Sequence, residues 1–144
     1  MLNFILLYNP RLNINSIFKY PSLISIGMLT KAIVIIDDEA DLVNLFSEAL
    51  KLNSFKVCAF TNPLEALNNI EKNPEEYGLV ISDFKMPVMD GNELCTKLIH
   101  INPNLKVILM SAYSDVRYDK EKFLFVNKPI SIAQLIELAK KHLP

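Results

Sequence analysis

The sequence predicts an α/β fold in which a parallel β-sheet carries helices on both faces. From residue 31 onward, short apolar runs alternate with segments whose apolar residues recur at helical spacing. The apolar runs are continuous, which is typical of strands buried on both faces of a parallel sheet. Short loops join these segments, and 144 residues suffice for one domain with one sizeable core.

The first unit begins at residues 32–36, an apolar run that we predict as a strand because acidic residues end it. Residues 41–52 follow as a helix, and the acidic residue at its start suits the positive end of the helix dipole. Apolar residues at helical spacing predict its inner stripe: Leu42, Leu45, Phe46, Ala49 and Leu50. Residues 55–60 are predicted as the second strand.

Cap residues and a loop define the next two helices. Asn62 at the N-cap, Pro63 at the first helical position and Glu65 at N3 predict a helix that an Asn-Pro pair ends. A continuous apolar run at 79–82 predicts the third strand. After a loop that contains proline and glycine, a helix is expected at 92–101.

The last two units are less regular. Residues 106–110 and 123–126 are predicted as the fourth and fifth strands. The polar stretch between them, 115–122, is expected to form a short or irregular helix. Ser131 predicts the cap of a final helix. Its candidate inner residues are Leu135, Ile136, Leu138 and Ala139.

The N-terminal segment, residues 1–27, differs from the rest. It carries only two charges, Arg11 and Lys19, and prolines interrupt its apolar runs well short of the ~18 residues that a membrane helix needs. The positive charge follows the first apolar run, whereas a secretory signal places it before. We expect a poorly ordered extension or a mis-assigned start, with the functional domain at 28–144. An anchor or docking arm is the alternative.

Composition limits the classes of partner. The formal net charge is −1 and no basic block is present, so direct nucleic-acid binding is not expected. Two cysteines form no disulfide framework and indicate reduced thiols in a cytoplasmic chain. No membrane span is expected.

Polar residues stand where the predicted strands end. Asp37 and Asp38 follow the first strand, Asp83 ends the third, Ser111 follows the fourth and Lys128 follows the fifth. Parallel strands end at one edge of the sheet, where open α/β sheets hold their ligands. Three clustered carboxylates repel one another unless a cation binds them, and oxygen ligands suit Mg²⁺. Asp83 is the candidate nucleophile for phosphoryl transfer; the alternative is that it only caps the next helix.

Several motifs in one order resemble the receiver domain of two-component response regulators. They read I-V-I-I-D-D-E at 33–39, S-D-F-K-M-P-V-M-D-G at 82–91, S-A at 111–112 and F-V-N-K-P at 125–129. The resemblance extends from about Leu29 to the C-terminus. It implies the flavodoxin-like, doubly wound fold, with five parallel strands in the order 2-1-3-4-5.

The same resemblance implies a phosphorylation site. Asp83 is the phosphoacceptor, Asp38 binds Mg²⁺ directly and Asp37 acts mostly through water. The backbone carbonyl of Lys85 is a further metal ligand, and Lys128 contacts the phosphoryl group.

Three further residues correspond to the conformational switch of that family. Ser111 is the switch hydroxyl, Ala112 is the small residue that leaves the phosphate accessible, and Phe125 is the aromatic ring that moves. The chain departs from the family where Phe125 replaces a frequent Tyr. Only 17 positions separate Ser111 from Lys128, and the Gly-Ala pair common before the fifth strand is absent.

The resemblance implies a single-domain response regulator that accepts a phosphoryl group on Asp83 from a histidine kinase or phosphotransfer protein. It would signal to an unidentified downstream protein by changing its binding surface. Such a domain is no enzyme, although it assists its own phosphorylation and dephosphorylation. One alternative is a phosphatase-like enzyme with an Asp nucleophile, but Asp83-Phe84-Lys85 lacks the second acid of a D-x-D motif. The other is a receiver-like module that binds partners without phosphorylation.

Overall fold

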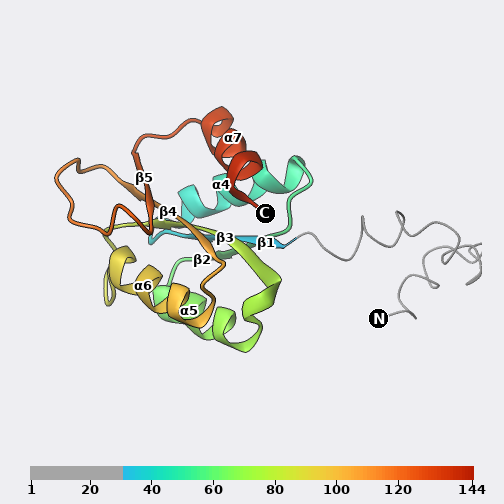
Figure 1. Cartoon of the computed structure of the whole chain (residues 1–144). Helices are drawn as coiled ribbons and strands as arrows, with labels where there is room; N and C mark the ends of the chain where they lie inside the picture. The colour runs from blue at the N-terminus through green and yellow to red at the C-terminus, as the bar shows by residue number, and fades with distance from the viewer. Residues whose placement is uncertain (1–30) are drawn as a thin grey trace, which may run out of the picture. The chain divides into compact units, whose positions relative to one another are not determined.

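The computed structural model describes residues 31–144. The extension predicted at 1–27 lies outside the described residues. Five strands form one parallel sheet in the order β2-β1-β3-β4-β5, as predicted (Figure 1). Their bounds are β1 Ala32–Ile36, β2 Val57–Phe60, β3 Tyr77–Asp83, β4 Lys106–Ser111 and β5 Leu124–Asn127.

Helices cover both faces of this sheet, which confirms the doubly wound arrangement (Figure 1). On one face lie α4 (Ala40–Leu52) and α7 (Ile132–His142), and on the other lie α5 (Pro63–Lys72) and α6 (Gly91–Ile101). A short 3₁₀ helix, η1 (Pro74–Glu76), leads into β3. None of the helices between residues 31 and 144 combines the length and the apolar composition that crossing a membrane requires.

The core consists of two apolar layers, because successive side chains of a strand point to opposite faces of the sheet. In β1, Val34 and Ile36 pack toward α5 and α6, while Ile33 and Ile35 pack toward α4 and α7. All residues of β1 and β3 are buried. This double burial explains why both strands are continuous apolar runs in the sequence, and it fixes the strand ends that carry polar residues.

Local capping explains where three helices begin. The Asn62 side chain accepts a hydrogen bond from the Leu64 amide (2.9 Å), with Pro63 at the first helical position, as predicted. Ser131 and Gln134 form a reciprocal capping box at α7. Asp90, whose Oδ1 accepts from the Glu93 amide (2.8 Å), caps α6. The cap of the helix after β3 is therefore Asp90 and not Asp83.

The inner face of α4 differs from the predicted stripe. Leu45 is 52% exposed, whereas Val43 and Ser47 are buried together with Phe46 and Leu50. The buried residues recur at i, i+3, i+4 and i+7, so they form one face of the helix. Leu45 lies outside that face although it is apolar, and the small Ser47 occupies an inner position that apolar periodicity does not reveal.

The helix predicted at 115–122 is wrong, because these residues are not helical. Of the segment's apolar residues, Val116 and Tyr118 are half-buried, but they stand two positions apart. That spacing gives no apolar helix face, and a helix this short needs one to be stable. A turn at Asp119 leads into β5 instead, where the Phe123 amide donates to the Asp119 carbonyl (3.0 Å).

Candidate functional site

The carboxyl ends of the strands meet at one edge of the sheet, as predicted. The register pairs Ile36 with Ser82, Asp83 with Met110, and Ser111 with Asn127. The polar residues that follow or end these strands therefore lie at the same edge of the sheet.

Lys128 joins three of these strand ends. Its Nζ lies 2.6 Å from Asp37 Oδ2 and 2.6 Å from Asp83 Oδ1. Its backbone amide donates to the Ser111 carbonyl (2.8 Å), and the Lys128–Pro129 peptide bond is cis. An amine that is 91 positions from Asp37 in sequence thus bridges two carboxylates on neighbouring strands. This bridge is the centre of the site.

Asp83 is almost fully buried, with 6% of its surface exposed. Burial raises the pKa of Asp83, and the contacts with Lys128 oppose that rise only in part. Burial also opposes the charge of Lys128, but its hydrogen bonds to Asp37 and Asp83 outweigh burial and raise the Lys128 pKa. Lys128 therefore carries its positive charge in the site. The second oxygen of Asp83, Oδ2, accepts from the Lys85 amide (2.9 Å).

Asp37 and Asp38 occupy different environments. Asp37 is fully buried, and its Oδ1 accepts from the Glu39 amide (3.0 Å) while Oδ2 accepts from Lys128. Asp38 is exposed. The buried carboxylate is thus held in place by the protein, and the exposed one faces solvent at the same edge.

The donor set at this edge fits Mg²⁺. Within residues 31–144, no three His, Cys, Asp or Glu side chains are grouped closely enough to enclose a metal by themselves. Mg²⁺ does not require such a cage, because it keeps several waters and takes only one or two carboxylates. Two carboxylates, Asp37 and Asp83, share the Lys128 ammonium here, and oxygen is the donor that Mg²⁺ prefers. The residues that would hold it are Asp37, Asp38, Asp83 and the backbone carbonyl of Lys85.

The loop between β3 and α6 brings the start of α6 against the site. The Gly91 amide donates to the Phe84 carbonyl (2.8 Å), and a Cβ at Gly91 would lie 2.2 Å from the Asp83 carbonyl oxygen. Only glycine fits there. Within the same loop Val88 has a positive φ of 73°, which is rare for a β-branched residue. The sequence marked this loop by its proline and glycine, but it did not reveal the close approach.

Of the three residues predicted to form the switch, Ser111 contacts Lys128, whose amide donates to the Ser111 carbonyl. Ser111 is 1% exposed, and its Oγ accepts from the Tyr113 amide (3.1 Å). Ala112 is exposed. The half-buried Phe125 stacks on Tyr118, with ring centroids 5.0 Å apart and an interplanar angle of 18°. Sequence reasoning missed Tyr118. Its contact with Phe125 depends on the path of the loop, and no local sequence pattern indicates it.

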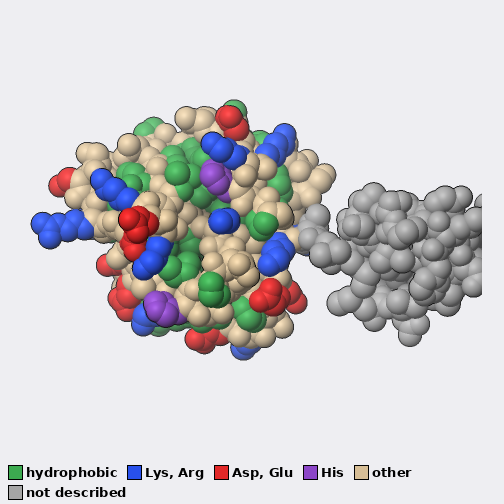
Figure 2. Space-filling view, in the orientation of Figure 1, with side chains coloured by type: hydrophobic (Ala, Val, Ile, Leu, Met, Phe, Trp, Pro, Cys, Tyr) green, Lys and Arg blue, Asp and Glu red, His purple; other side chains and the backbone are tan. Residues whose placement is uncertain are grey.

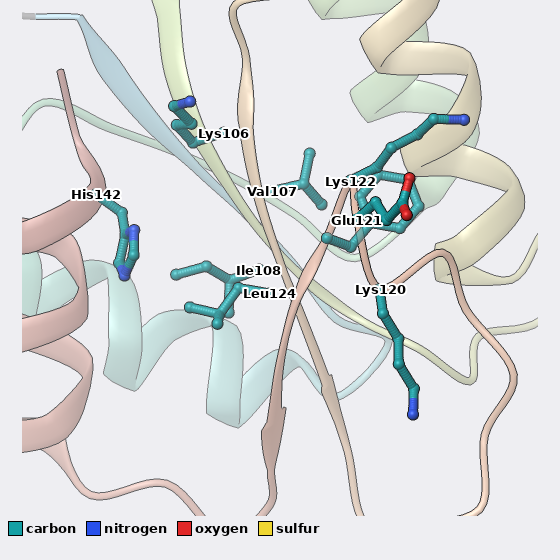
Figure 3. Close-up of a pocket in the computed structure, with 9 residues that line it drawn as sticks. Lys106, Val107, Ile108, Lys120, Glu121, Lys122, Leu124 and His142 are labelled. Carbon is teal, nitrogen blue, oxygen red and sulfur yellow. The ribbon is translucent and has the colours of Figure 1, made fainter.

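A cavity of about 250 Å³ lies elsewhere, at the amino ends of β4 and β5 (Figure 3). Its lining residues are Lys106, Val107, Ile108, Lys120, Glu121, Lys122, Phe123, Leu124 and His142. None of the predicted site residues is among them. Figure 2 shows basic and acidic side chains interspersed on the face in view. No extended basic surface is visible on that face (Figure 2).

Comparison with known proteins identifies relatives. Residues 33–140 match the family described as "Response regulator receiver domain". Sporulation initiation phosphotransferase F of Bacillus subtilis is 31% identical over 122 residues, which cover 81% of this chain and 97% of that protein. The C4-dicarboxylate transport transcriptional regulatory protein DctD of Rhizobium meliloti is 30% identical over 76% of this chain. The matched region is only 25% of DctD.

Solved structures agree with this match. The receiver domain of the hybrid histidine kinase CckA has a TM-score of 0.68 and 30% identity, and the match covers 78% of this chain and 99% of that one. A CheY-like receiver domain protein from Methanospirillum hungatei has a TM-score of 0.70 and 26% identity, over 80% of this chain and 94% of that one. The family match covers most of the chain, and strand order and relatives agree with it. The chain therefore belongs to the family of response regulator receiver domains of two-component systems.

Proposed function

We propose that this receiver domain accepts one phosphoryl group on Asp83 and that Lys128 provides the positive charge for the transfer. The single observation that supports this most is the position of the Lys128 ammonium, 2.6 Å from both Asp37 and Asp83. The carboxylate supplies the nucleophile, and the fixed cation beside it stabilises the negative charge of the group that is transferred.

The donor would be a phosphohistidine of a histidine kinase or phosphotransfer protein. An Asp83 carboxylate oxygen attacks phosphorus in line, the oxygen–phosphorus bond forms, and the phosphorus–nitrogen bond to the donor histidine breaks. Lys128 moves from the carboxylate toward the phosphoryl oxygens, while Asp37 retains its other hydrogen bond, to Glu39. When bound, Mg²⁺ supplies further neutralisation of the phosphoryl charge through Asp38, Asp83 and the Lys85 carbonyl.

Ser111 supports a switch that follows phosphorylation. Its Oγ acts as an acceptor for the Tyr113 amide, which leaves its own proton free to donate to a phosphoryl oxygen. Phosphorylation adds about −1.5 to −2 charge at pH 7. Phe125 then changes position, and the surface that binds the downstream protein changes with it.

The hydrogen bond from Ser111 cannot supply all of the free energy that a complete switch requires. A shift from 1:99 to 99:1 requires about 5.5 kcal/mol of preference for the second state. A hydrogen bond to a charged group contributes only about 1.5–3 kcal/mol. Lys128 and the metal must therefore contribute the remainder, or the shift is smaller than complete.

Intact mass measurement after incubation with acetyl phosphate and Mg²⁺ tests the proposal. The wild-type protein should gain one phosphoryl group, and EDTA should prevent the gain. Asp83→Asn should remain unlabelled, whereas Asp90→Asn in the same loop should be labelled, because Asn retains the N-cap of α6.

Labelling of Asp83→Asn to the wild-type level would show that the phosphoacceptor is wrong. No labelling of the wild-type protein would instead favour a module that binds partners without phosphorylation.

A further inference from the structure

The segment between β4 and β5, residues 112–123, forms an extended loop at the end of the sheet (Figure 1). Within residues 31–144, the hydrogen bonds of this loop lie at its two ends. The Tyr113 amide donates to Ser111 Oγ (3.1 Å). Asp119 accepts from Glu121 through its side chain and from Phe123 through its carbonyl, and it pairs with Lys122 at 2.9 Å.

Between these ends, aromatic stacking attaches the loop to the body of the domain. The Tyr118 ring lies nearly parallel to the Phe125 ring at a centroid distance of 5.0 Å. Both rings are half-buried and pack against the apolar layer under α5 and α6. Stacked aromatic pairs stabilise a contact beyond the area that they bury. The stack therefore orders a loop that has no helix of its own.

The same loop touches both residues of the proposed switch. The Tyr113 amide donates to Ser111 Oγ, and the Tyr118 ring stacks on Phe125. Phe125 is fixed in register with Leu109 of β4, so its ring can change place only by rotating. Rotation of Phe125 away from its present position removes the partner of Tyr118. The loop then loses its central attachment while its two ends remain bound.

We propose that Tyr118 is a positioning residue for Phe125, which holds the ring in its unphosphorylated place, and that release of the Tyr118 loop is the surface change that partners detect. This inference rests on the proposed function. In the unphosphorylated state the stack keeps residues 112–122 ordered. In the phosphorylated state Phe125 leaves the stack and the loop is freed.

Linkage predicts a second consequence. A contact that stabilises the unphosphorylated state weakens the binding of any ligand that prefers the phosphorylated state. The factor by which binding weakens equals the factor by which the contact shifts the equilibrium between the two states. Removing the Tyr118 ring should therefore tighten the binding of beryllofluoride, which mimics a phosphoryl group on a carboxylate. Aromatic pairs of this kind are worth roughly a two- to tenfold change in an equilibrium. A residue whose contacts are the same in both states would not change this affinity.

The test compares wild type, Tyr118→Ala, Tyr118→Phe and the matched control Val116→Ala, a half-buried neighbour in the same loop. Hydrogen exchange of residues 112–122 is measured with and without beryllofluoride and Mg²⁺, and calorimetry gives the affinity. In wild type, beryllofluoride should speed exchange of the loop. Tyr118→Ala should exchange fast without it and bind it roughly two- to tenfold more tightly. Tyr118→Phe keeps the ring and should behave as wild type, as should Val116→Ala.

The outcomes separate the two claims. If wild type does not bind beryllofluoride, the proposed function fails and this inference fails with it. If wild type binds it but exchange of residues 112–122 does not change, the inference alone fails. Equal affinity in Tyr118→Ala and wild type, or equal effects of Val116→Ala and Tyr118→Ala, would also overturn it.

Discussion

Asp83 lies at the end of β3 with only 6% of its surface exposed, so its carboxylate has lost most contact with water. Lys128 compensates for this loss only in part, and the same ammonium also binds Asp37. The pKa of Asp83 is raised, chiefly by burial. A buried charge held close to a single cation opposes folding, and this arrangement is typical of sites whose chemistry needs the charge.

Asp83→Asn should therefore raise the free energy of unfolding at neutral pH. Because its pKa is raised on folding, the folded protein binds the Asp83 proton more tightly than the unfolded chain. The unfavourable contribution of Asp83 is thus complete above the raised pKa and disappears as the pH falls below the unfolded value of about 3.9.

Urea unfolding in EDTA at neutral pH and near pH 4 measures this difference, with the exposed N-cap variant Asp90→Asn as control. The difference in the free energy of unfolding between Asp83→Asn and wild type should be smaller near pH 4 than at neutral pH. A gap of equal size at both pH values, or a less stable Asp83→Asn protein at neutral pH, would contradict the account.

Among the elements, those with local signals could be predicted. The Asn62-Pro63 start and the Ser131 cap depend on neighbours within three residues, and both are present. The inner face of α4 depends on what packs against it, so the apolar pattern alone wrongly predicts that Leu45 is a core residue. Residues 112–123 depend on the stack of Tyr118 on Phe125, and no local pattern encodes that contact.

The loop between β3 and α6 offers a test at this scale. Gly91→Ala would place Cβ 2.2 Å from the Asp83 carbonyl oxygen, so the end of β3 or the start of α6 must move. We expect a loss of stability of about 1–3 kcal/mol, as for other overpacked sites, and much slower labelling by acetyl phosphate.

Gly78→Ala is the control, because Gly78 lies at the amino end of β3 and its Cβ would meet side-chain atoms at 2.9 Å or more. It should leave the labelling rate unchanged. If Gly91→Ala is labelled as fast as Gly78→Ala, the close packing of Gly91 against the Asp83 carbonyl does not position the Asp83 side chain.

At the scale of the molecule, the sheet makes the site predictable. Parallel strands end at one edge, so Asp37, Asp83, Ser111 and Lys128 could be placed together from the order of the strands alone. The sequence could not show that Lys128 divides its contacts between two carboxylates, or that Asp37 is buried while Asp38 is exposed. Those details depend on side-chain packing between strands that are far apart in sequence.

The central claim is that the phosphoryl group resides on Asp83, and locating it chemically tests this most directly. Sodium borohydride reduces an aspartyl phosphate to homoserine, which peptide mass spectrometry then finds at a single position. After incubation with acetyl phosphate and Mg²⁺, the account predicts homoserine at position 83 and unchanged residues at 37, 38 and 90. Homoserine at one of those three positions, or a stable phosphate on Ser111 with Asp83 unmodified, would contradict it.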